Sequence, residues 1–270
     1  MIQSLYPLSD SSSLILACPM DILSRLYRLP TGRFHYTLLG LIGVGWLFDA
    51  MDTGLVSFVL PTLSQQWQLT PAQSGWIVSV AFVGMALGAV ASGWAADRFG
   101  RRNVFVGTMV LYSIATGLCA VSPNLSVLLF CRFWVGFGLG GQLPVAVSLV
   151  SEFAPPAVRG RLIVLLESFW GLGWLAAALA SWGFIPRFGW HSAFWIGALP
   201  IFYAFWVWRR LPESVPYLLN KGRVDEAHAL VSRLEAQAGL PVVAEAVVAA
   251  TAPHEPIRFG QLWKPPFARR

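Results

Sequence analysis

Six stretches of mostly apolar residues, each long enough to cross a lipid bilayer, constrain this chain more than any other feature of its sequence. A transmembrane helix needs about 20 mostly apolar residues, because the hydrocarbon core is about 30 Å thick and each helical residue adds about 1.5 Å. Charged residues make up only 12% of the 270 residues, against about 25% in soluble domains. We therefore predict an all-α membrane protein with six transmembrane helices, covering residues 36–60, 75–96, 104–121, 125–150, 162–184 and 192–208.

The basic residues predict how these helices are oriented. Connections on one side of the predicted membrane carry most of the arginines, whereas the connections on the other side carry only Arg187. Cytoplasmic loops are enriched in Lys and Arg, so both ends of the chain are expected in the cytoplasm, with the helices in a bacterial inner membrane. The arginines on the cytoplasmic side are Arg25, Arg28, Arg33, Arg98, Arg101, Arg102, Arg159, Arg161, Arg209 and Arg210.

Three regions follow from this topology. Residues 1–35 are expected to form a cytoplasmic amino-terminal segment, and residues 36–211 the six-helix bundle. Residues 212–270 are expected to form a cytoplasmic segment that contains one amphipathic helix, at residues 225–238. That segment ends in a basic, amphipathic stretch of the kind that leads into a further membrane helix, so a second half is expected and missing from this sequence.

Several function classes are excluded at this stage. The net charge of +6 comes mostly from basic residues beside apolar stretches, which indicates topology rather than a nucleic-acid partner. The cysteines have no metal-ligand spacing, the four histidines are scattered, and no phosphate-binding loop of the G-x-x-x-x-G-K-[ST] type occurs. The sequence therefore predicts no metal, no cofactor and no enzyme activity.

Glycines recur at a spacing of four within two of the apolar stretches. Gly84 and Gly88 lie in the second stretch, and Gly136 and Gly140 in the fourth. Small residues at this spacing let two membrane helices pack closely. The run from Gly136 to Gly141 also matches the spacing of a dinucleotide-binding fingerprint, but that fingerprint has to follow a strand, and this run lies inside an apolar helix. We therefore interpret these glycines as packing residues.

Four charged residues lie inside the predicted membrane helices: Asp49, Asp52, Arg132 and Glu167. Such a residue costs roughly 2.5–3.5 kcal/mol to insert, so it usually faces a cavity and a partner. Counted from the outer ends of their helices, Asp52 and Arg132 lie at nearly equal depth, where a bidentate contact can neutralise both. If a conformational change separates them, Asp52 is expected to take up a proton. Asp49, Asp52 and Arg132 are thus the candidate proton-coupling residues; the alternative is a static pair that only holds two helices together.

The candidate substrate-binding residues are Glu167, Trp170, Gln142 and Arg132. Glu167 has aromatic neighbours in its own helix, and a carboxylate among aromatic rings suits a small, flat, polar ligand. The alternative for the aromatic residues individually is that they pack against other helices or face lipid.

Five motifs at the predicted membrane boundaries resemble those of the major facilitator superfamily, and in particular its sugar-porter-like branch of metabolite:proton symporters. The two clearest are Asp97-Arg98-Phe99-Gly100-Arg101-Arg102 after the second stretch and Arg132 followed by Gly136, Gly138 and Gly140 in the fourth. The others begin at Glu152, Pro212 and Gly222. The resemblance implies one half of a major facilitator fold, made of two inverted three-helix repeats and working by alternating access.

The resemblance also implies roles for single residues. Asp52 and Arg132 match the family's proton-coupling aspartate and its fourth-helix partner, and Glu167 stands where sugar porters place a sugar-binding glutamine. A cytoplasmic gate network is implied for Asp97, Arg101, Glu152, Arg159 and Glu213.

The strings around Asp52 and Glu167 resemble those of bacterial niacin permeases, so the implied substrate is nicotinate or another aromatic acid, with a sugar or another carboxylate as the alternative. The implied partners are protons, the small-molecule substrate, the lipid bilayer and a second six-helix half. An alternative function is a truncated membrane remnant, or a subunit that is inactive without that half.

Overall fold

The computed structural model of the chain describes residues 22–240, and this part is built from helices. The outer parts of both predicted cytoplasmic segments lie outside these residues. In chain order the helices are α1 (Ile22–Tyr27), α2 (Arg33–Trp67), α3 (Pro71–Phe99), α4 (Arg101–Ala120), α5 (Leu125–Phe153), α6 (Arg159–Phe188), α7 (His191–Gly197), α8 (Pro200–Arg210), α9 (Val215–Asn220) and α10 (Val224–Gln237).

Within these residues, the five helices α2 to α6 are long and apolar enough to cross a membrane, and they contain the first five predicted stretches. The sixth stretch is interrupted, because α7 and α8 are separated by a turn at Ala198 and Leu199. Pro200 has no N–H to continue the helical pattern. Around it, the N–H groups of Leu199, Ile201 and Phe202 bond to the carbonyl three residues back, which tightens the chain locally.

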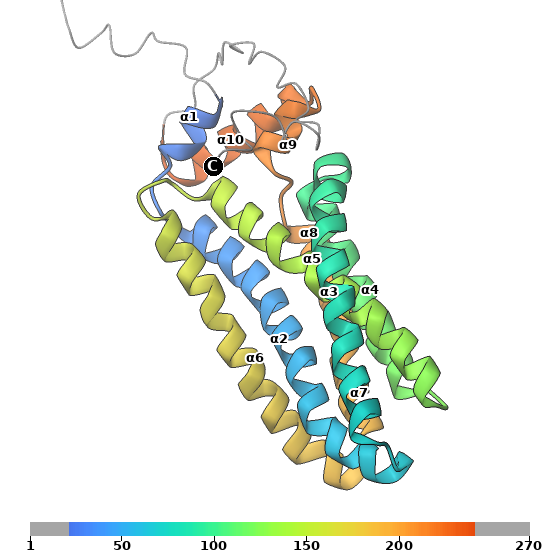
Figure 1. Cartoon of the computed structure of the whole chain (residues 1–270). Helices are drawn as coiled ribbons and strands as arrows, with labels where there is room; N and C mark the ends of the chain where they lie inside the picture. The colour runs from blue at the N-terminus through green and yellow to red at the C-terminus, as the bar shows by residue number, and fades with distance from the viewer. Residues whose placement is uncertain (1–21, 241–270) are drawn as a thin grey trace, which may run out of the picture.

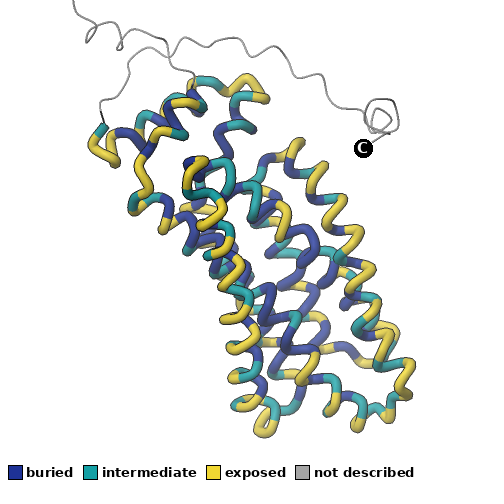
Figure 2. Tube along the Cα trace, turned by 60° about the vertical axis from the view of Figure 1, so that its left-hand side comes forward, coloured by how far each residue is buried: buried dark blue, intermediate teal, exposed yellow. Residues whose placement is uncertain are grey.

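The long helices pack in pairs. Helix α2 runs along α6, α3 runs along α5, and α4 packs against α5 and against α7 and α8 (Figure 1). The first three spans are α2, α3 and α4, and the last three are α5, α6 and the interrupted span α7–α8. Exchanging the two sets turns the α2–α6 pair into the α5–α3 pair, as expected for two inverted three-helix repeats. Buried residues lie along the inner sides of these helices and exposed residues along their outer sides (Figure 2).

The glycines of α3 and α5 allow these two backbones to touch. A Cβ added at Gly88 would overlap the carbonyl oxygen of Phe137, and one added at Gly140 would overlap that of Met85. Gly84 and Gly136 face the opposite backbone in the same way. The structure thus confirms the predicted packing role of these four glycines.

Replacing Gly88 with valine is expected to destabilise the bundle by about 1–3 kcal/mol, because the added side chain has to push α5 away from α3. Thermal unfolding of the detergent-solubilised protein measures the change. Gly93→Val is the matched control, since it lies in the same helix and a Cβ there meets nothing within 4 Å. Equal unfolding temperatures for the two variants would contradict the packing role.

Helices α1, α9 and α10 gather at one end of the bundle (Figure 1). Arg25 of α1 and Glu235 of α10 form an ion pair there, and both side chains are completely buried. Nε of Arg25 lies 3.1 Å from Oε1 of Glu235, and Nη2 lies 2.6 Å from Oε2. Nη2 also donates to Ser232, and Arg28 adds a second cation 3.5 Å from Glu235. The amino-terminal segment is therefore tied to the helix predicted at residues 225–238.

Candidate functional site

A buried ion pair joins α2 to α5 inside the bundle. Nη1 of Arg132 lies 3.3 Å from Oδ2 of Asp52, and both residues are almost completely buried. The other carboxylate oxygen, Oδ1, accepts a hydrogen bond of 2.7 Å from the hydroxyl of Thr116 in α4. The predicted contact between Asp52 and Arg132 is confirmed. It is made through one carboxylate oxygen and not two, while the other oxygen accepts the hydrogen bond from Thr116.

The sixth apolar stretch also packs against this pair. A Cβ added at Gly197, the last residue of α7, would lie 2.9 Å from Oδ1 of Asp52 and 2.8 Å from Cγ2 of Thr116. No larger residue fits there without moving one of these two groups. The carboxylate of Asp52 is therefore enclosed by helices α4, α5 and α7.

Asp49 lies one turn before Asp52 on the same side of α2, and it is also buried. Among the described residues, neither of its carboxylate oxygens has a hydrogen-bond partner of ordinary geometry, although the hydroxyl of Tyr112 faces it. Nε1 of Trp46 and the side-chain amide of Gln142 are buried in the same region, and neither has a hydrogen-bond partner within residues 22–240. Because buried polar groups nearly always have a partner, this cluster is suited to water, a proton or a polar ligand.

A cavity of about 690 Å³ opens beside Asp49. Trp46 and Asp49 line it from α2, and Glu167 and Trp170 line it from α6. The rings of Trp46 and Trp170 lie 4.9 Å apart between centroids and are tilted by 39°. The structure thus places two of the predicted substrate-binding residues, Glu167 and Trp170, on one cavity together with a predicted proton-coupling residue.

The other two predicted substrate-binding residues, Arg132 and Gln142, do not line this cavity. Arg132 lines a neighbouring cavity of about 140 Å³. Gln142 is completely buried, and its Nε2 would lie 3.2 Å from a Cβ added at Gly45. Thr53 lines both cavities, so the smaller one adjoins the larger one. The only deep arginine of the sequence prediction therefore faces Asp52 and not the larger cavity.

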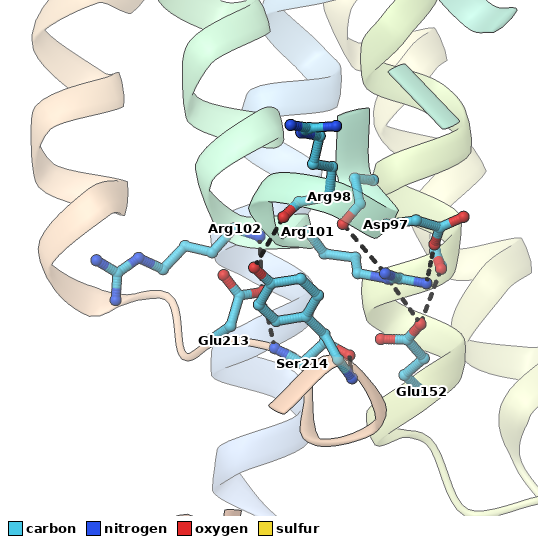
Figure 3. A network of polar contacts seen from close by, with 10 residues as sticks. Asp97, Arg98, Arg101, Arg102, Glu152, Glu213 and Ser214 are labelled. Carbon is cyan, nitrogen blue, oxygen red and sulfur yellow. Dashed lines mark hydrogen bonds and ion pairs between the residues drawn. The ribbon is translucent and has the colours of Figure 1, made fainter. Parts of the chain in front are cut away.

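Three of the five predicted gate residues form one group of ion pairs (Figure 3). Arg101 at the start of α4 lies 2.8 Å from Asp97 of α3 and 3.2 Å from Glu152 of α5. Ser148 also donates to Glu152, at 3.1 Å. The loop between α3 and α4 is thereby tied to the end of α5.

Glu213 and Arg159 make different contacts. Oε1 of Glu213 accepts hydrogen bonds from the backbone N–H groups of Arg102, at 3.1 Å, and Ser214, at 3.0 Å, so this carboxylate binds the first turn of α4 (Figure 3). Gly100 has a φ of +98°, and a Cβ there would overlap Glu213. Within the described part of the chain, Arg159 contacts the carbonyl of Ala154, at 3.4 Å, and the ring of Tyr27.

Residues 42–264 match a family described as sugar (and other) transporters. The chain belongs to this family. The niacin transporter NiaP of Acinetobacter baylyi is 60% identical over 251 residues, which cover 93% of this chain and 57% of the relative. The 4-hydroxybenzoate transporter PcaK of Pseudomonas putida is 34% identical, over 84% of this chain and 50% of the relative. This chain spans about half the length of the curated relatives it matches.

Solved structures show the fold of this family member. The major facilitator superfamily proton:xylose symporter XylE, bound to 6-bromo-6-deoxy-D-glucose, superposes with a TM-score of 0.67 at 20% identity. The match covers 76% of this chain and 51% of that protein. The chain is accordingly a multi-pass membrane protein with half of a major facilitator fold.

Sequence reasoning missed three residues of the site: Thr116, Tyr112 and Trp46. Thr116 and Tyr112 are one turn apart in α4, and both face the aspartates. Hydroxyl-bearing residues are common in membrane helices, so neither Thr116 nor Tyr112 stands out in the sequence as a charged residue does. Counting depth for buried hydroxyls as well would have placed Thr116 and Tyr112 near the level of the aspartates.

Proposed function

We propose that the protein is a secondary transporter that couples proton movement to the transport of a small organic metabolite by alternating access. The observation that carries this proposal is the buried Asp52–Arg132 ion pair, next to the buried carboxylate of Asp49 and a cavity of about 690 Å³. Charged groups at this depth are expensive and usually serve a transport pathway. Membership of the transporter family supports the same function.

In this proposal Asp52 is the proton-coupling residue. It stays charged while it holds the guanidinium of Arg132, and it takes up a proton when a conformational change separates the two. Thr116 holds the second carboxylate oxygen and thereby orients the group. Asp49, which is buried beside the hydroxyl of Tyr112 and borders the cavity, is the second residue on the proton path.

The proposed substrate is nicotinate or a related aromatic acid. Two indole rings, those of Trp46 and Trp170, offer apolar surfaces to a flat ring inside the cavity. The names of the relatives support an aromatic acid, because they are a niacin transporter and a 4-hydroxybenzoate transporter. Glu167 borders the same cavity.

We further propose that both ends of the chain lie in the cytoplasm, with the helices in a bacterial inner membrane. The Asp97–Arg101–Glu152 group, Glu213 and Arg159 would then lie at the cytoplasmic face and serve as its gate. The proposed boundaries remain residues 1–35 for the first cytoplasmic segment, 36–211 for the bundle and 212–270 for the last segment. A second six-helix half is the proposed partner that completes the substrate pathway.

The test is uptake of labelled nicotinate into liposomes that contain the purified protein, with and without an imposed proton gradient. The chain is assayed alone and together with the carboxyl-terminal half of the Acinetobacter baylyi relative. Gradient-dependent accumulation above that in empty liposomes, abolished by a protonophore, is the expected result. Nicotinate uptake that does not respond to the gradient would exclude proton coupling, and no uptake in either form would exclude the proposed transport of nicotinate.

A further inference from the structure

We infer that the wall of the cavity built by this chain recognises the ring nitrogen of a heteroaromatic substrate and not its carboxylate, and that Glu167 determines this specificity. The inference rests on the proposed function and adds the orientation of the substrate within the cavity. It also separates substrates that contain a ring nitrogen from benzoate-like acids of the same size.

The charged side chains that line the cavity determine which end of the substrate can face this wall. The charged side chains that line it are Asp49 and Glu167, and both are acidic. Arg132, the deep cation nearby, lies on the smaller cavity and is engaged by Asp52. A substrate carboxylate placed against this wall would approach the carboxylate of Glu167, with no cationic side chain among the described residues that line the same cavity, which is unfavourable. The anionic end of an acid therefore has to point away from this wall.

The position of Glu167 also supports this orientation of the substrate. It stands three residues before Trp170 in α6, so both side chains lie on one face of the helix. No hydrogen bond or ion pair to Glu167 is found within residues 22–240, whereas Ser168 next to it donates to the carbonyl of Leu165. A flat ring lying against Trp46 and Trp170 would thus bring its edge toward a carboxylate that the described residues leave without a partner.

The chemistry of the contact requires one proton. A pyridine nitrogen and a carboxylate are both acceptors, so they attract each other only when a proton lies between them, as in a pyridinium N–H that donates to a carboxylate. Benzoate has a C–H at that position and cannot share a proton with Glu167. A hydrogen bond that involves a charged group contributes enough to separate two such ligands by about 10-fold to 100-fold.

Competition by nicotinamide and benzamide against uptake of labelled nicotinate tests the inference. These two neutral amides have the same size and lack a carboxylate, and they differ only in the ring nitrogen. For the unmodified protein we expect nicotinamide to inhibit at a concentration about 10-fold or more below that of benzamide. Glu167→Leu should bring the two inhibitory concentrations together. Glu167→Gln should keep part of the difference, because its amide N–H can donate to a pyridine nitrogen.

Ser168→Ala is the matched control, since it changes a neighbouring polar residue in α6 that does not line the cavity, and it should keep the full difference. An unchanged ratio in Glu167→Leu would overturn the inference. So would a lack of discrimination by the unmodified protein, or no inhibition by either amide, while nicotinate uptake itself continues. If the unmodified protein takes up no nicotinate, the proposed function fails first and the inference fails with it.

Discussion

Replacing Asp52 with asparagine is expected to abolish the accumulation of substrate against its gradient while leaving exchange of substrate across the membrane. Asparagine keeps an oxygen that accepts the hydrogen bond from Thr116, but it cannot take up or release a proton. Without that step, transport equilibrates substrate on the two sides and goes no further. The measurement is labelled uptake under an imposed proton gradient, followed by counterflow in the absence of a gradient.

Counterflow also shows that the variant is folded, which matters because Asp52→Asn leaves Arg132 with an unpaired buried charge. Thr116→Val is the matched control. It removes the hydrogen bond to Oδ1 of Asp52 but leaves a carboxylate that can be protonated, so uphill uptake should persist, at an altered pH dependence. Full uphill uptake by Asp52→Asn would eliminate this residue from the coupling mechanism.

The second large effect is expected at the buried ion pair between Arg25 and Glu235, which stabilises the fold and has no proposed part in transport. Replacing Arg25 with alanine should destabilise the packing of α1 on α10 by about 3–5 kcal/mol, because it leaves the carboxylate of Glu235 buried without its bidentate partner. The partly exposed Arg28 lies farther from Glu235 and replaces that contact only in part. Hydrogen–deuterium exchange of α1 and α10 measures the loss of protection.

The double variant Arg25→Met, Glu235→Met is the control for this prediction. Replacing both partners with apolar side chains of similar length removes the charge and fills the space, so stability should stay close to that of the unmodified protein. Loss of protection in the single variant and its recovery in the double variant would identify the unpaired charge as the cause. If Arg25→Ala exchanges as slowly as the unmodified protein, the ion pair contributes nothing to the docking of α1.

Patterns along the chain were sufficient for the membrane helices and for the central ion pair. Apolar length located α2 to α6, and counting depth from the helix ends paired Asp52 with Arg132. Both predictions depend on the thickness of a bilayer, because that thickness sets how many apolar residues a membrane helix needs and how deep a given residue lies. The interruption of the sixth stretch was not predicted, although Pro200 provided a local signal for it.

The contact between Arg25 and Glu235 could not be found in this way. The sequence indicates Arg25 only as a topology signal, and nothing in it singles out Glu235 within the helix predicted at residues 225–238. The two are 210 positions apart, and no periodicity connects them. A similar limit applies to Arg132, which the sequence predicts as a substrate-binding residue. Which cavity a buried side chain lines depends on how the helices pack. Only the packed structure shows that Arg132 lines the smaller cavity and not the larger one.

The backbone contact between α3 and α5 limits which movements this bundle allows. Where two helices touch through glycines, a shift of one backbone pushes against the other, so we expect α3 and α5 to move together. Helices α2 and α6 pack along each other as a second pair, and the contacts from α2 to α3 and from α5 to α6 are much sparser. We therefore expect any widening of the bundle to occur between these two helix pairs, which the ion pair between Asp52 and Arg132 connects.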